Sequence, residues 1–109
     1  TISTPGKNTV EISDDDKHIK LTDQNKNEIV MNSSGISLSS AKDITLKAKG
    51  AITIEATSKI NATAKQDVSL EGLNVKMEAK VSATVKGNAK AELSASGQTT
   101  VKGAMVMIN

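Results

Sequence analysis

Side chains that could carry chemistry are few in this chain of 109 residues. Asp14, Asp15 and Asp16 offer three consecutive carboxylates, and His18, the only histidine, follows closely. The aspartates lack the spacing and the distant glutamate of a helix-loop-helix calcium site, and one histidine without cysteine makes a poor transition-metal site. We therefore predict a solvated turn at the aspartates, a surface strand position for His18, and neither a metal nor a cofactor.

The remaining reactive groups do not form a catalytic or nucleic-acid-binding pattern. No serine is spaced from His18 as a nucleophile would be, and no glycine-rich phosphate loop leads from a strand into a helix. The lysines of the later sequence could form a basic stripe: Lys47, Lys49, Lys65, Lys76, Lys80, Lys86 and Lys90. However, the chain has no arginine and no aromatic residue for base stacking, and glutamates intervene. We predict that the protein is not an enzyme and binds no nucleic acid.

The residues around these groups follow an eight-residue repeat. Its two main apolar rows are Ile36, Ile44, Ile52, Ile60 and Val68, and Leu38, Leu46, Ile54, Ala62 and Leu70. A seven-residue step leads from Val68 to Val75, after which the eight-residue spacing resumes. A short fixed repeat indicates stacked units, each too small to bury its own apolar face. The pattern is typical of a solenoid or a fibre.

Within each unit the side chains alternate. Every even position from Lys76 to Lys102 is polar, and the odd positions between are Val, Met, Ala, Leu or Gly except Thr99. Alternation gives a strand one dry and one wet face, and the three- and four-residue spacing of an amphipathic helix is absent. The sequence therefore predicts an all-β fold.

Composition indicates that one chain cannot complete this fold. Phe, Trp and Tyr are absent, and many inward positions are Ala or Gly, so a wide globular core cannot be filled. Small side chains do fit a narrow tube in which backbones converge on an axis. Because the missing apolar area would come from other copies of the chain, we expect an oligomeric fibre.

Two zones are expected along the chain. Residues 1–35 form an irregular β neck or meander: a tether at 1–5, short strands at 9–12, 18–21 and 28–31, and a closing turn at 32–35. Residues 36–109 form the octapeptide-repeat β-helix shaft. The seven-residue step would reverse every later side chain unless the backbone absorbed it. Glycine tolerates unusual conformations, so we expect an irregular corner at residues 71–74, next to Gly72.

The alternation of polar and apolar residues ends at the C-terminus, where five consecutive residues, Ala104 to Ile108, are apolar. They could form a buried final strand, or an exposed apolar platform that awaits a partner. The second alternative predicts a partner-binding tip, which would comprise Ala104, Met105, Val106, Met107, Ile108 and Asn109.

Three stretches of the sequence resemble the C-terminal spike of the VgrG (valine–glycine repeat protein) family of type VI secretion and its relatives in contractile phage tails. They are residues 27–31 together with 34–38, the repeat unit at 43–48, and the terminus at 101–109, which is the most specific match. The resemblance implies a homotrimer wound into an intertwined triangular β-helix, or β-prism. It further implies a structural, membrane-piercing spike of a contractile injection machine, with a PAAR-repeat tip protein at its C-terminal end.

The same resemblance implies inner-tube or baseplate partners for domains upstream of Thr1, cytoplasmic assembly, export on contraction, and transient contact with a target membrane. Some phage spikes hold iron through histidines at the point, but no histidine follows His18 here.

Two other classes remain open. A trimeric fibre or adhesin stalk would normally carry aromatic or arginine clusters for recognition. A single-chain β-helix enzyme would need longer coils and clustered catalytic side chains. A mass measurement in solution separates a monomeric solenoid from a trimer.

Overall fold

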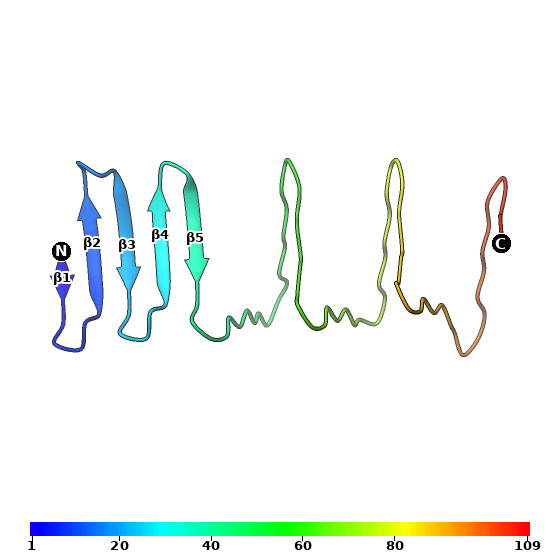
Figure 1. Ribbon diagram of the computed structural model, residues 1–109, viewed down its shortest axis with the longest axis horizontal. Coiled ribbons are helices and arrows are strands. Elements are labelled where there is room, and N and C mark those ends of the chain that lie inside the picture. Colours follow the sequence, from blue (N-terminus) through cyan, green and yellow to red (C-terminus); the bar gives the residue numbers. More distant parts are fainter. The chain divides into compact units, whose positions relative to one another are not determined.

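A computed structural model describes all residues, 1–109. Its regular strands lie within the first 39 residues (Figure 1), and they are β1 Ile2–Ser3, β2 Thr9–Ser13, β3 His18–Thr22, β4 Glu28–Asn32 and β5 Gly35–Ser39. They form one antiparallel sheet in chain order. The absence of helices confirms the predicted all-β class, and no helix is present that could cross a membrane.

Short polar turns connect the strands. The Asp14–Lys17 segment joins β2 to β3, and the Asp16 amide donates to Ser13 Oγ at 3.1 Å. Lys17 has a φ of 56°. This is the left-handed conformation, which the tight turn requires and which only glycine or asparagine adopts at little cost. The predicted turn at the aspartates is therefore confirmed.

The three expected strands are confirmed as β2, β3 and β4, but two parts of the neck prediction were wrong. Residues 1–5 are not merely a tether, because Ile2 and Ser3 pair with Val10 and Thr9 of β2. The turn at residues 32–35 does not end the meander either. It is a two-residue hairpin loop into β5, in which Asn32 pairs with Gly35.

Strand register gives this sheet one apolar face. A row of paired residues crosses all five strands: Ile2, Val10, Leu21, Ile29 and Leu38. A second row crosses four strands: Ile12, Ile19, Met31 and Ile36. The residues of the two rows are two positions apart on each strand, so both rows lie on the same face. The opposite face is mostly polar, with Val30 as its apolar exception.

The chain divides into two units, Thr1–Ile60 and Asn61–Asn109. Beyond β5 it consists of extended segments separated by two-residue bends, which lie at residues 41–42, 49–50, 57–58, 65–66, 73–74, 80–81, 88–89, 96–97 and 104–105. Successive bends are eight residues apart except for one seven-residue interval, between 73–74 and 80–81. The local backbone thus follows the repeat read from the sequence.

The bend at Leu73–Asn74 falls within the range in which an irregular corner was expected. Its position continues the preceding eight-residue spacing, and the irregularity is the missing residue between Asn74 and Val75. A β-carbon added to Gly72 would lie 3.2 Å from the Asn74 carbonyl oxygen. A glycine therefore accommodates the close backbone approach at the point where the register changes.

Candidate functional site

The chain has no core of its own. Its solvent-accessible surface is 11536 Å², and no hydrophobic side chain is buried. A folded monomer of 11.3 kDa would expose about 5,700 Å², roughly half of that area. The residues that should form a core are present but uncovered, so the candidate functional site is an assembly surface.

The apolar face of the sheet is the first part of this surface. Ile12 is 67% exposed and Ile36 79%, although both belong to its paired apolar rows. A hollow of about 560 Å³ lies over this face, lined in part by Val10, Leu21, Leu38 and also Ile44. Because Ile44 is the first residue after Ile36 in the same apolar row of the repeat, the apolar surface is continuous from the sheet into the shaft.

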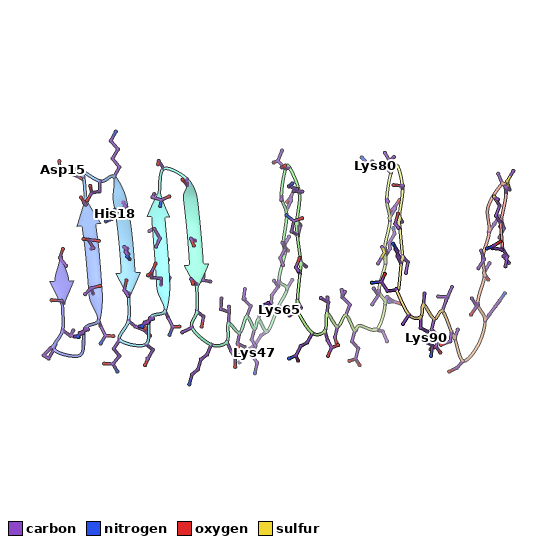
Figure 2. The ribbon with its side chains drawn as sticks, viewed as in Figure 1. Asp15, His18, Lys47, Lys65, Lys80 and Lys90 are labelled. Carbon is purple, nitrogen blue, oxygen red and sulfur yellow. The ribbon has the colours of Figure 1, made fainter.

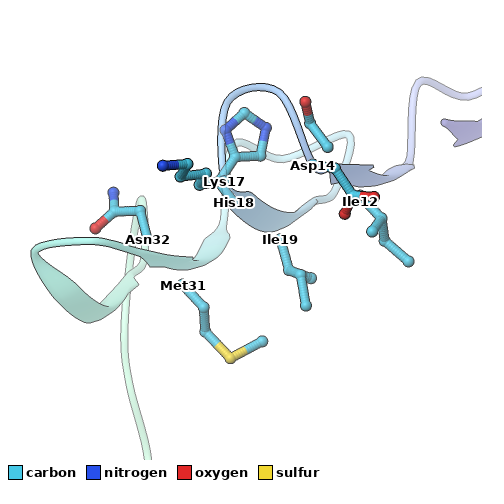
Figure 3. Close-up of a pocket in the computed structure, with 8 residues that line it drawn as sticks. Ile12, Asp14, Lys17, His18, Ile19, Met31 and Asn32 are labelled. Atoms are coloured by element: carbon cyan, nitrogen blue, oxygen red, sulfur yellow. The ribbon is translucent and has the colours of Figure 1, made fainter.

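Polar pairs occupy the opposite face of the sheet. His18 Nε2 lies 3.0 Å from Glu11 Oε2 across β2 and β3, and Lys20 Nζ lies 3.9 Å from Glu28 Oε2 across β3 and β4. Figure 3 shows the separation at one end of the sheet, where the side chains of Ile19 and Met31 leave one side and that of His18 leaves the other.

His18 is therefore a partly exposed strand residue, as predicted, but its partner Glu11 was not identified. The diagonal pairing of residues across a hairpin could have indicated it. Asp14, Asp15 and Asp16 lie in the turn beyond these strands, and they do not converge with other ligands into a group that could hold a metal ion (Figure 2).

Unpaired backbone is the second part of the assembly surface. Every backbone–backbone hydrogen bond of the chain lies within the five-stranded sheet or its turns, and none involves a residue beyond Ser39. The extended segments between the bends consequently present their N–H and C=O groups without partners, except for the Asp43 carbonyl, which accepts from the Ser40 hydroxyl at 3.0 Å. Buried backbone groups of folded proteins are almost always paired, so these exposed segments are suited to pairing with strands of other chains.

Ion pairs along the shaft support the predicted wet face. Lys76 Nζ lies 3.4 Å from Glu78 Oε2, and Lys90 Nζ lies 3.1 Å from Glu92 Oε2 (Figure 2 labels Lys90). Partners two residues apart meet only when the backbone is extended and both side chains leave the same side. These pairs also offset part of the positive charge of the lysines that the sequence suggested as a basic stripe.

A polar cluster around Asp23 and Asn27 joins the sheet to the shaft, and sequence reasoning missed it. Asp23 Oδ1 accepts from the amides of Asn25 and Asn27 at 2.9 Å each, and Asp23 Oδ2 accepts from Asn27 Nδ2 at 2.9 Å. Asn27 Oδ1 in turn accepts from the Ala41 amide at 3.0 Å and the Ser40 hydroxyl at 3.1 Å. The cluster thereby fixes the first bend of the shaft against the β3–β4 turn.

The hydrogen bonds from the backbone and side chain of Asn27, followed by those from Asn25, hold the pKa of Asp23 below its ordinary value. The carboxylate is thus stabilised in its charged form as the acceptor that organises this turn.

The predicted partner-binding tip lies at the last bend, residues 104–105. Met105 is 78% exposed, Met107 85% and Ile108 91%, whereas Val106 is half exposed. Gly103 permits the backbone to turn there, because an added β-carbon would lie 3.1 Å from the Met105 carbonyl oxygen. In Figure 1 the chain reverses direction just before Asn109. The tip thus presents apolar side chains to solvent, and no residue of the chain covers them.

These features define a class: a β-structured assembly domain whose apolar faces and backbone groups are completed by other copies. Residues 1–109 match the family model of the phage baseplate V C-terminal trimerisation domain, and the chain belongs to this family. No curated protein matches the chain. Family membership makes the chain a structural domain of a baseplate spike, supports a homotrimer, and accords with the prediction that it is not an enzyme.

Proposed function

We propose that three copies of this chain wind into a triangular β-prism that forms the membrane-piercing spike of a contractile injection machine, either a type VI secretion system or a phage-tail-like particle. The observation that carries the proposal is that the shaft makes no backbone–backbone hydrogen bond beyond Ser39, in a chain of a trimerisation family. Strands of three chains wound about one axis would pair laterally and leave no free sheet edge.

Such a trimer is suited to mechanical work. Its inward rows of Ile, Val, Leu, Ala and Gly would form a narrow dry interior, and its outward Lys and Glu residues a solvated exterior. A rod in which every backbone group is paired resists bending and unfolding under an axial push. Penetration of a membrane requires that stiffness and a sharp end, and it requires no catalytic residue.

The sharp end is the second element of the proposal. Threefold symmetry would bring together fifteen apolar residues, five from each chain, between Ala104 and Ile108. A surface of this kind is costly in water, and the final strands would offer unpaired backbone groups to a partner. A conical PAAR-type protein would cover both, and the flexible side chains of Met105 and Met107 would adapt to its contour.

We place assembly in the cytoplasm and release at the target cell upon contraction, where contact with the membrane is brief. We propose components of the inner tube and the baseplate as further partners of the spike.

The docking experiment uses the tip protein encoded with the spike. We expect pull-down of this protein by the full trimer and a loss of at least tenfold in bound protein when residues 105–109 are deleted. Lys102→Ala is the matched control, because it removes a side chain from the wet face of the segment that precedes the last bend and should not affect binding. The mass of every variant is measured first. Undiminished binding by a truncated chain that is still a trimer would place the docking site elsewhere.

A further inference from the structure

One repeat unit of the shaft is one residue shorter than all the others. The bends at 73–74 and 80–81 are seven residues apart, whereas every other pair of successive bends is separated by eight. Comparison with the preceding unit shows what is missing, since Asp67 lies between its bend and Val68 but nothing lies between Asn74 and Val75.

The regular units cannot by themselves specify how the chains align. If one chain is displaced by eight residues relative to its neighbours, Ile44 takes the place of Ile52, and Ile52 that of Ile60. Within the overlapping units, apolar residues still face inward and polar residues outward, and each pair of units can form the same pattern of backbone hydrogen bonds. A displaced register that leaves the inward and outward faces unchanged therefore competes with the correct register. Coiled coils have the same ambiguity, because their heptads repeat, and a polar residue at one core position specifies their register.

The short unit removes this degeneracy. In a chain displaced by eight residues, the segment after Asn74 would be one residue out of phase with the full-length unit of its neighbour. A one-residue offset sends each side chain to the opposite face of a strand. Val75 and Met77 would then turn towards water, and Lys76 towards the interior.

The bends on either side of the short unit also differ from the others. Leu73 is 100% exposed and Val81 97%, so nothing in their own chain covers these two apolar side chains. The residues at the other bends before the tip are polar or are alanine or glycine: Ala41, Lys42, Lys49, Gly50, Thr57, Ser58, Lys65, Gln66, Asn88, Ala89, Ser96 and Gly97. Two bulky apolar side chains thus bracket the only unit of different length.

We propose that the unit from Leu73 to Val81 is an interaction surface for further copies of this chain, which it accepts in one register only. The inference rests on the proposed trimer. It states that the one seven-residue unit aligns three chains whose other units are all alike.

The experiment reads register directly in the full-length chain. Because cysteine is absent, Lys90→Cys creates a single attachment site for a spin label on an exposed side chain of the wet face. Pulsed electron paramagnetic resonance on an aligned threefold trimer gives one label–label distance. A trimer with a displaced chain adds a second, longer distance.

Two variants test the inference. Inserting one aspartate between Asn74 and Val75 makes all units equal, and we expect the single distance to be replaced by a mixture. Deleting Lys59 as well leaves the bends at 57–58 and 65–66 seven residues apart, which restores one short unit at another place. This matched control should recover the single distance.

A single distance in the insertion variant would overturn the proposal, and so would a mixture in the control variant that has a relocated short unit. The mass of the unmodified chain distinguishes this result from a failure of the proposed function. If the unmodified chain is a folded monomer, the trimer itself is wrong and no register exists to be set.

Discussion

At the residue scale, Asp23 shows how one charged group can organise a junction. Its carboxylate accepts hydrogen bonds from the amides of Asn25 and Asn27. The side-chain oxygen of Asn27 accepts hydrogen bonds from Ser40 and Ala41 at the first bend of the shaft. These residues are unremarkable in the sequence, because Asp and Asn are common in turns. Their importance comes from the position of the β3–β4 turn beside the end of β5.

The first prediction concerns the pH dependence of this junction. The pKa of Asp23 is lower in the folded state than in the unfolded state. Such a carboxylate stabilises the folded state at pH values above its unfolded pKa, and this stabilisation is lost as the pH falls through its folded pKa. We expect Asp23→Asn to have a lower melting temperature than the unmodified protein at pH 7. The difference should shrink below about pH 4, where the aspartate also becomes neutral. A difference that is constant from pH 7 to pH 2 would contradict this role for the charge.

A second residue-scale prediction tests the two faces of the shaft with neighbouring residues. Val85 belongs to the inward row, and Lys86 to the wet face. Val85→Asp would place three carboxylates around one dry axis, and we expect a loss of more than about 2 kcal/mol per chain. Lys86→Glu should change stability by about 0.5 kcal/mol or less. Chemical denaturation of both variants is the measurement, and equal losses would show that the assignment of faces is wrong.

At the scale of elements, the hairpin between β4 and β5 depends on one backbone conformation. Gly35 has a φ of 124°, and Asn32 Oδ1 accepts a hydrogen bond from the Ser34 amide at 2.9 Å in the same turn. Side chains other than hydrogen rarely permit that φ. The turn matters because it adds β5 to the sheet and so directs the chain towards the shaft.

The third prediction follows from a comparison of two glycines. A β-carbon added to Gly35 or to Gly50 would meet nothing within 4 Å, but only Gly35 has a positive φ. We therefore expect Gly35→Ala to destabilise the protein by about 1–3 kcal/mol per chain through backbone strain. Gly50→Ala should cost less than about 0.5 kcal/mol. Thermal melts of the two variants decide the matter, and similar melting temperatures would exclude strain as the cause.

At the scale of the whole molecule, we expect assembly and folding to be one process. No hydrophobic side chain is buried within the chain, and no backbone–backbone hydrogen bond involves a residue beyond Ser39. An isolated chain would lose conformational entropy on folding without the burial of apolar surface that normally offsets this loss. We therefore expect its stability to depend on the concentration of chains.

The fourth prediction is that the melting temperature rises with concentration while the mass remains that of a trimer. For three chains that fold and associate together, a tenfold increase in concentration favours the trimer by about 2.7 kcal/mol per mole of trimer. Calorimetry at two concentrations, combined with light scattering, measures both quantities. A melting temperature independent of concentration, in a sample of folded monomers, would refute coupled folding and assembly.

The sequence alone determined the β class, the eight-residue repeat, the seven-residue step and the two faces of the shaft. These properties are local, because alternation and period depend only on neighbouring residues in an extended chain. Tertiary structure decided the pairing of Ile2 with Val10, the extension of the sheet to β5, the His18–Glu11 contact and the Asp23–Asn27–Ser40 connection. Each of these joins residues through strand register or through adjacent turns, and register follows from how the strands align in space rather than from the order of residues along any one of them.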